Sequence, residues 1–180
     1  MFPLYYNIGN ILNGNIQSGG ILMAKTWTDD TALVKSLAEN LCEASVLLPR
    51  QLMHMDDLSR SFHMPFSHIQ ILIMLANGDK SIGMISYMLG IAKPNITPLL
   101  DALMDRNLVQ RIRSTEDRRI VYVHLTDDGR KMLDDIYAAV MEEVNKWDEF
   151  YGRPEAKHVN AAMESMVNLV YRRAEANGKE

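Results

Sequence analysis

Four arginines gather in one short stretch of an acidic chain, and their chemistry is the recognition of anionic groups. They lie between residues 113 and 131 of a 180-residue chain whose formal net charge is −4. Arg118 and Arg119 directly follow the acidic residues Glu116 and Asp117. A guanidinium presents several N–H donors in one plane, which suits phosphate and carboxylate oxygens. The cluster therefore predicts a surface that meets a polyanion.

The charge of the chain is unevenly distributed. From Lys93 to Lys131 there are eight basic and six acidic residues, a local balance of +2. The remainder carries eleven basic and seventeen acidic residues, a balance of −6. A positive module on an acidic body is compatible with a polyanion that is met at one face. Charged stretches are more often solvated surface, so the elements that carry the arginines decide between the two interpretations.

Two short helices joined by a tight turn are predicted between residues 80 and 109. Ser81 can cap the first helix, and Gly90 supplies the turn. The second helix begins near Pro94, a favourable residue in a first turn. Its apolar side comprises Ile96, Leu99, Leu100 and Leu103. Its polar side comprises Lys93, Asn95 and Thr97. This is the helix-turn-helix pattern, although a small helical bundle could also contain it.

A β-hairpin is predicted directly behind these helices. The first strand covers residues 109–113, and S-T-E-D at 114–117 forms the turn. The second strand runs from Arg118 to Thr126, with apolar residues at alternate positions. A helix-turn-helix followed by a hairpin is a winged helix. Its second helix can enter a major groove of DNA while arginines at the hairpin tip reach an adjacent minor groove.

Residues from about Ser67 to Leu133 resemble the MarR (multiple antibiotic resistance regulator) family of winged-helix transcription factors. The wing carries the family's D-x-R…V-x-L-T-x-x-G signature as Asp117, Arg119, Val123, Leu125, Thr126 and Gly129. Asn107 stands where the family usually has Gly, and Asn tolerates a left-handed backbone. Pro98 stands inside the recognition helix where many members have Arg, so a backbone donor and a candidate phosphate contact are lost.

The resemblance implies a mainly α fold with a small β-hairpin wing. A winged helix-turn-helix is expected between N- and C-terminal dimerisation helices. We expect an unstructured extension over residues 1–24, which carry no charged side chain, or alternatively an arm that packs on a partner. The dimerisation region of the N-terminal helix would span 25–62, the DNA-binding domain 63–133 and the C-terminal dimerisation helices 134–180.

Apolar stripes at helical spacing mark the flanking helices. The first follows a predicted cap at Thr28 and comprises Leu33, Leu37, Leu41, Ala44, Leu48, Leu52 and Met55. Pro49 should kink or divide that helix, and Ser67 with Gln70 predicts a capping box for the next. Thr126 should cap a long helix whose buried side comprises Met132, Leu133, Ile136, Ala139, Val140 and Val144. The last helix aligns Val159, Ala162, Met163, Met166, Val167 and Val170. Such a stripe predicts a homodimer, packing against the first helix of the same chain, or both.

The resemblance also implies which residues would contact DNA. A dimer places two recognition helices about 34–36 Å apart on a pseudo-palindromic, double-stranded operator. The expected contacts come from the cap of the first helix, the second helix and the wing: Ser81, Lys93, Pro94, Asn95, Thr97, Arg113, Ser114, Thr115, Asp117, Arg118 and Arg119. Asp117 is expected to accept from the Arg119 side chain and direct it, or alternatively to accept from backbone N–H groups of the turn.

Regulation by a small molecule is a further implication of the resemblance, because family members commonly repress transcription until an aromatic effector releases them from DNA. The candidate effector-binding residues are Met53, Met55, Met64, His68 and Met74, with ordinary core methionines as the alternative. Cys42 raises a redox-responsive version. His54, His63 and His68 raise a metal-responsive version, but their spacing does not place all three on one helical face, so we predict no metal and no cofactor.

Composition and missing motifs bound the other classes. The single cysteine excludes an internal disulfide and fits a reducing cytosol. No apolar run reaches the ~18 residues that would cross a bilayer. The chain has no Gly-rich phosphate loop, no H-E-x-x-H and no G-x-S-x-G, so we predict that it is not an enzyme. A winged helix that binds only protein stays open; salt-dependent DNA binding would distinguish the two.

Overall fold

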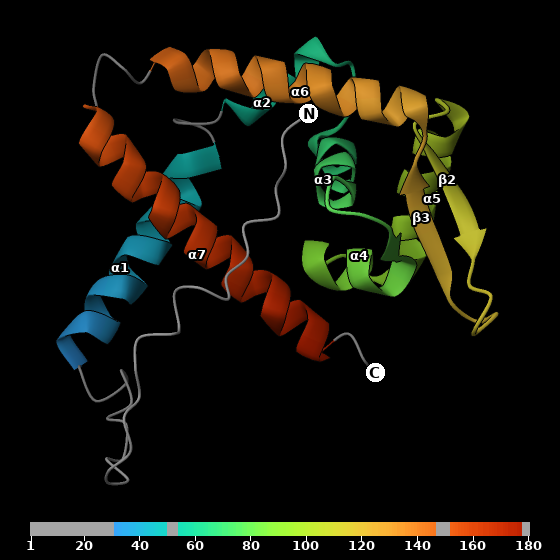
Figure 1. Cartoon of the computed structure of the whole chain (residues 1–180), viewed down its shortest axis with the longest axis horizontal. Coiled ribbons are helices and arrows are strands. Elements are labelled where there is room, and N and C mark those ends of the chain that lie inside the picture. The colour runs from blue at the N-terminus through green and yellow to red at the C-terminus, as the bar shows by residue number, and fades with distance from the viewer. Residues whose placement is uncertain (1–30, 50–53, 147–151, 178–180) are drawn as a thin grey trace, which may run out of the picture. The chain divides into compact units, whose positions relative to one another are not determined.

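The computed structural model describes residues 31–49, 54–146 and 152–177 (Figure 1). The chain divides into two compact units, Met1–Glu43 and Ala44–Glu180. Helix α1 (Thr31–Leu47) contributes most of its length to the first unit. The second unit contains α2 (Met55–Ser61), α3 (Phe66–Leu75), β1 (Lys80–Ser81), α4 (Ile82–Leu89), α5 (Lys93–Asp105), β2 (Val109–Arg113), β3 (Val121–Leu125), α6 (Asp127–Asn145) and α7 (Arg153–Asn177). The predicted mainly α fold with a small β wing is confirmed.

One hydrophobic core joins the helices of the winged helix to its sheet. Helix α3 lies at its centre and buries residues on several sides. The largest fully buried side chains are Ile69, Ile71, Leu72, Ile85, Ile96, Leu100, Leu103, Val123 and Ile136. These residues come from α3, α4, α5, β3 and α6, so the recognition helix and the wing rest on the same packed interior.

The sheet has three antiparallel strands in the order β1-β3-β2. Strands β2 and β3 pair from Val109↔Leu125 to Arg113↔Val121 and form the predicted hairpin. Strand β1 has only two residues, with Lys80 opposite Val123, and was absent from the sequence-based prediction. It ties the start of α4 to the wing, because α4 begins directly after it.

The local signals that delimit the helix-turn-helix and α6 are confirmed. The Ser81 hydroxyl caps α4 by accepting from the Met84 amide at 3.1 Å. Gly90 ends α4 in the left-handed region with φ of 64°. Asn107 has φ of 56°, so Asn does take the left-handed conformation for which Gly is usual. Thr126 caps α6.

Two boundary predictions and one burial prediction were wrong. Helix α3 begins at Phe66 with Pro65 as its N-cap and no side-chain cap bond, so the Ser67–Gln70 capping box is not formed. Strand β3 begins at Val121 rather than Arg118, because the Ile120 amide donates to the Asp117 carbonyl at 2.9 Å in a turn. Val144, expected on the buried side of α6, is 42% exposed.

The flanking helices carry their apolar stripes at the surface. Helix α1 ends at Leu47 and α2 begins at Met55, in agreement with a chain divided near Pro49. The predicted extension 1–24, the cap at Thr28 and the stripe residue Leu52 lie outside the described residues. Helix α7 begins one residue before Pro154, and its predicted stripe is exposed along its length. None of the helices in the described ranges is long and apolar enough to cross a bilayer.

Candidate nucleic-acid interface

Helix α5 presents one polar and one apolar side, as its sequence predicts. Ile96, Leu100 and Leu103 face the core with at most 1% of their surface exposed. The opposite side is exposed and includes Lys93, Pro94, Asn95, Thr97 and Pro98. The apolar residues recur at steps of three and four, which puts them on one face of a helix. The helix is thus anchored from behind and leaves its N-terminal half open to a partner.

Lys93 and the N-terminus of α4 converge on one place. A Cβ added to Gly83 would lie 3.7 Å from the Lys93 Cε and 3.9 Å from its Nζ. The first amides of a helix have no partner within the helix, and the positive end of its dipole is there. The Lys93 ammonium and the end of α4 capped by Ser81 can therefore meet the same anionic group, such as a backbone phosphate.

Hydrogen bonds from nearby backbone amides to two side chains, Ser114 and Asp117, stabilise the wing tip. The Ser114 hydroxyl accepts from the amides of Glu116 and Asp117, both at 3.2 Å. The Asp117 carboxylate accepts from the Arg119 amide at 2.9 Å. These bonds are typical of turns that Ser and Asp stabilise against their own backbone. They hold the tip so that Thr115, Arg118 and Arg119 are exposed.

The contacts therefore do not favour the hypothesis that Asp117 directs the Arg119 guanidinium. The carboxylate binds the Arg119 main chain instead, which was the alternative interpretation. The same turn explains the position of Glu116, because its amide is one of the two donors to Ser114. Glu116 and Asp117 thus take part in hydrogen bonds that stabilise the backbone of the turn, while the Arg118 and Arg119 side chains are exposed at its tip.

Arg111 links the wing to the recognition helix, a role that was not predicted from the sequence. Its guanidinium pairs with Asp101 of α5 at 2.8 Å and donates to the Thr97 carbonyl at 3.5 Å. Arg111 shares a face of the sheet with Val109, which is buried. The alternation of β2 already contains this signal, since residues two apart in a strand point to the same side.

The base of the wing is joined to α6 by a second set of contacts. The Thr126 amide donates to the Leu108 carbonyl at 3.1 Å, and its hydroxyl donates to the Asn107 carbonyl at 2.5 Å. The Asn107 side chain in turn donates to Asp128 at 2.8 Å. A Cβ on Gly129 would lie 1.9 Å from the Leu108 oxygen. The T-x-x-G part of the signature therefore closes the joint between α5, the sheet and α6.

Three of the candidate effector-binding residues belong to or pack against the core. Met64 and Met74 are buried, and Met55 packs against the same cluster. The His68 Nε2 atom is buried, and no described residue forms a hydrogen bond with it. Burial, and secondarily the charge of Arg106, lower the pKa of His68 below its usual 6.5. Met53 lies outside the described residues.

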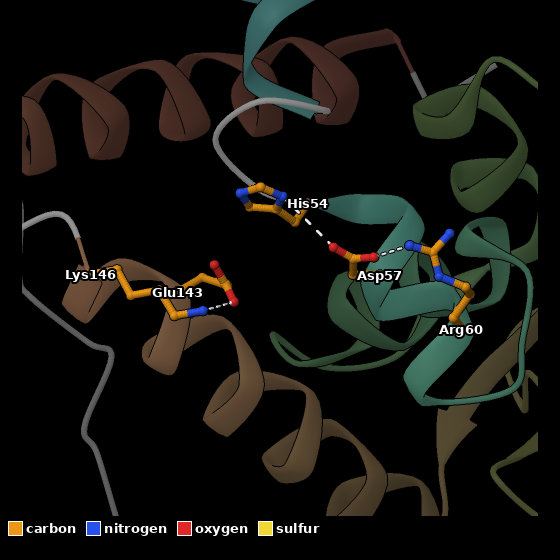
Figure 2. Close-up of polar contacts among 5 residues, drawn as sticks. All are labelled: His54, Asp57, Arg60, Glu143 and Lys146. Carbon is orange, nitrogen blue, oxygen red and sulfur yellow. Dashed lines mark hydrogen bonds and ion pairs between the residues drawn. The ribbon is translucent and has the colours of Figure 1, made fainter.

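The residues of the redox- and metal-responsive alternatives lie on or beside helices α1, α2 and α3. Cys42 is exposed on α1. Figure 2 shows His54 beside Asp57, whose carboxylate also contacts Arg60; the His54 Nδ1 to Asp57 Oδ2 distance is 3.8 Å. The same view shows Glu143 paired with Lys146 near the end of α6, a hydrogen bond that raises the pKa of Lys146. The parts of the chain that the structure describes contain no group of three His, Cys, Asp or Glu residues that could hold a metal ion.

Known transcriptional regulators resemble this chain in the region of the winged helix. Residues 54–136 match the family model "Transcriptional regulator SarA/Rot". The HTH-type transcriptional regulator YpoP of Bacillus subtilis is 38% identical over 61 residues, which are 34% of this chain and 43% of YpoP. The chain therefore matches less than half the length of this relative.

Solved structures resemble a larger share of the chain. A MarR transcriptional regulator from Methanosarcina mazei superposes with a TM-score of 0.60 at 19% identity, covering 79% of this chain and 98% of that one. Apo MarR from E. coli gives a TM-score of 0.59 at 14% identity, covering 70% and 95%. At such identities the likeness concerns the fold. Together with the family match over residues 54–136, it shows that this chain has a winged-helix fold similar to that of MarR and SarA/Rot transcriptional regulators.

Proposed function

We propose that the protein is a dimeric, sequence-specific DNA-binding regulator that represses transcription until a small molecule releases it. The observation that carries the proposal is the geometry of the recognition helix and the wing. The exposed side of α5 and the arginines of the wing project from one rigid core, and the Arg111–Asp101 pair holds them together. This arrangement suits a major groove and the minor groove beside it.

Each part of the proposed interface has a distinct role. The Asn95 amide can pair with adenine, and the Thr97 methyl can contact the methyl group of thymine. Lys93 and the α4 terminus would bind backbone phosphate, because the Lys93 cation lies near the positive end of the α4 dipole. Arg118 and Arg119 would enter the minor groove, where the negative potential favours arginine. Arg113, Ser114 and Thr115 would contact the backbone beside it.

Dimerisation would set the spacing of the two half-sites. The exposed apolar residues of α1 and α7 favour a partner, since contiguous apolar surface is characteristic of interfaces. Two recognition helices about 34–36 Å apart would then bind a pseudo-palindrome.

Release by an aromatic effector is supported by the buried His68 Nε2, which has no hydrogen-bond partner among the described residues, and by Met55, Met64 and Met74, which belong to or pack against the hydrophobic core. A phenolic hydroxyl could donate to this nitrogen, and methionine adapts to ligands of different shape. A thermal-shift screen with phenolic acids tests this part. A compound that binds the wild-type protein should bind a His68→Leu variant more weakly. Redox release through Cys42 and metal release remain alternatives that oxidant and divalent-metal arms of the same screen would reveal.

Selection of fragments from random double-stranded DNA tests the central proposal. Bound fragments should contain two half-sites related by two-fold symmetry. Affinity should fall with salt at a log–log slope near −0.9 for each phosphate contact. Arg119→Ala should weaken binding to the selected fragment and make the slope shallower, whereas Arg172→Ala on α7 should not. Failure to enrich any fragment would favour a winged helix that binds protein only.

A further inference from the structure

The outward side of the recognition helix carries two prolines. Pro94 and Pro98 are both exposed, and their spacing of four residues puts them on one side of α5. That side lies opposite Ile96 and Leu100, which are fully buried. From residue 94 to residue 105 the chain contains no Lys or Arg. This part of α5 therefore has no side chain for the bidentate recognition of guanine by a cation.

The chemistry of this side follows from the covalent structure of proline. The two rings present CH₂ groups and no donor. Because Pro98 has no N–H, the carbonyl of Pro94 lacks the partner that it would have in a regular α-helix. The side of α5 that carries Pro94 and Pro98 thus offers apolar contact and the Pro94 carbonyl oxygen as a hydrogen-bond acceptor. In the major groove, the apolar feature that distinguishes a base pair is the C5-methyl group of thymine.

The helix is held in place around Pro98 although one of its own hydrogen bonds is missing. Arg111 binds the Thr97 carbonyl on one side of this proline and the Asp101 carboxylate on the other. The proline ring has a fixed φ and almost no side-chain rotamer freedom to lose on binding. Both rings are therefore presented in a defined position without an ordering cost.

We propose that Pro94 and Pro98 determine sequence specificity by packing against thymine C5-methyl groups in the operator half-site. This inference rests on the proposed function, because it assumes that α5 enters a major groove. Two residues without any polar side-chain atom would then distinguish between base pairs, as a basic side chain does elsewhere by hydrogen bonding to guanine. The half-site should accordingly contain thymines whose methyl groups, rather than their hydrogen bonds, are recognised.

Replacement of single thymines by deoxyuridine tests this directly, because the change removes only the methyl group. The probe is the fragment that the wild-type protein selects from random DNA. One or two thymines of each half-site should respond. Deoxyuridine at one of them should lower wild-type affinity about 4-fold, as expected from the loss of one buried methyl group. The same change in both half-sites should lower it about 15-fold. Elsewhere in the fragment deoxyuridine should have no effect, except at a thymine whose methyl group contacts Thr97; that effect should persist in both proline variants.

Two variants assign the contact to the prolines. Pro98→Ser should bind the selected fragment but lose the deoxyuridine effect at one thymine, and Pro94→Ser at a neighbouring one. Pro154→Ser changes a proline at the second position of α7 and should keep the full effect. Pro98→Ser also restores an N–H inside the helix, so it should fold at least as stably as the wild type. If Pro98→Ser nevertheless binds no DNA, the Pro94→Ser variant and the deoxyuridine replacements with the wild-type protein test whether the prolines contact thymine methyl groups.

Equal wild-type affinity for the thymine and deoxyuridine fragments would overturn the inference. So would a deoxyuridine effect that persists at every thymine in both proline variants. Either result leaves DNA binding itself intact. By contrast, a wild-type protein that selects no fragment at all would overturn the proposed function on which the inference rests.

Discussion

The absence of a side chain at Gly129 allows three elements to meet. A Cβ there would lie 1.9 Å from the Leu108 oxygen, which accepts from the Thr126 amide. The carbonyl belongs to the backbone and cannot swing away as a flexible side chain would. The requirement for Gly at this position is therefore one of space and not of backbone conformation, since Gly129 lies inside α6.

Gly129→Ala should lower the free energy of unfolding by about 1–3 kcal/mol, because the added methyl forces α6 away from the base of the wing. Urea denaturation followed by circular dichroism measures this. Gly83→Ala is the matched control, since the added methyl would meet its nearest atom at 3.7 Å and Ala favours a helix by up to about 1 kcal/mol. Equal midpoints for Gly129→Ala and the wild type would show that the joint can open without cost.

His68 should make stability depend on pH, because burial lowers its pKa below 6.5. When the folded-state pKa of a base is depressed, the unfolded state binds the proton more readily. The stabilisation is thus complete above pH 6.5 and is lost as the pH falls from there toward the folded-state pKa. His68→Gln should flatten the decline of melting temperature between pH 7 and 5, whereas His158→Gln on exposed α7 should retain it. A decline of the same size in both variants would rule His68 out as its source.

Residue roles that depend on local chain geometry could be predicted from the sequence. Ser81, Gly90 and Asn107 fulfil the predicted roles because a cap or a left-handed residue is defined within a few positions. The partners of Asp117 and Arg111 could not be assigned in the same way. Their hydrogen bonds depend on the exact turn and on the register between β2 and β3.

At the scale of elements, the α5–β2 contact sets the angle between the recognition helix and the wing. Asp101 and Arg111 lie on different elements, and the pair is only partly exposed, with Arg111 at 29%. Partial burial strengthens an ion pair relative to one on the open surface. The Arg111 charge, which contributes to the local positive balance, is thus used within the molecule and is not offered to DNA.

A double-mutant cycle with Asp101→Asn and Arg111→Gln should give a coupling of about 0.5–1 kcal/mol in the free energy of unfolding. The single variants should also weaken binding to the selected DNA fragment, because the wing loses its fixed position relative to α5. The exposed pair Lys35–Glu39, 3.6 Å apart on α1, provides a control cycle in which the coupling should be smaller. Strict additivity at Asp101 and Arg111 would mean that the pair does not fix the angle.

The element boundaries show where sequence patterns suffice and where they fail. Helices α4, α5 and α6 begin close to their predicted positions because caps and prolines act locally. Strand β1 has two residues and exists only through its pairing with β3, so no pattern of its own could predict it. Strand β3 begins three residues later than predicted because Arg118 and Arg119 belong to the turn. The alternation of apolar and polar residues does not show where this turn ends.

At the scale of the whole molecule, apolar surface on the terminal helices is left uncovered by the described part of the chain. Five residues of the α7 stripe are at least 41% exposed: Val159, Met163, Met166, Val167 and Val170. Met141 and Val144 near the end of α6 are exposed as well. A stripe of this length costs solvation free energy when it faces water, at about 25 cal/mol for each Å². Burial between two copies of the chain would recover it.

Met166→Glu should therefore convert the proposed dimer into a monomer, because the carboxylate would be buried at the interface without a partner. Asn168→Glu places the same side chain on the opposite side of α7 and should leave the dimer intact. Sedimentation velocity distinguishes the two states. The monomeric variant should also bind a two-half-site fragment no more tightly than a single half-site, since the avidity of linked winged helices is lost. If Met166→Glu stays dimeric, the α7 stripe is not the interface, and the spacing of the recognition helices must be set by other surfaces.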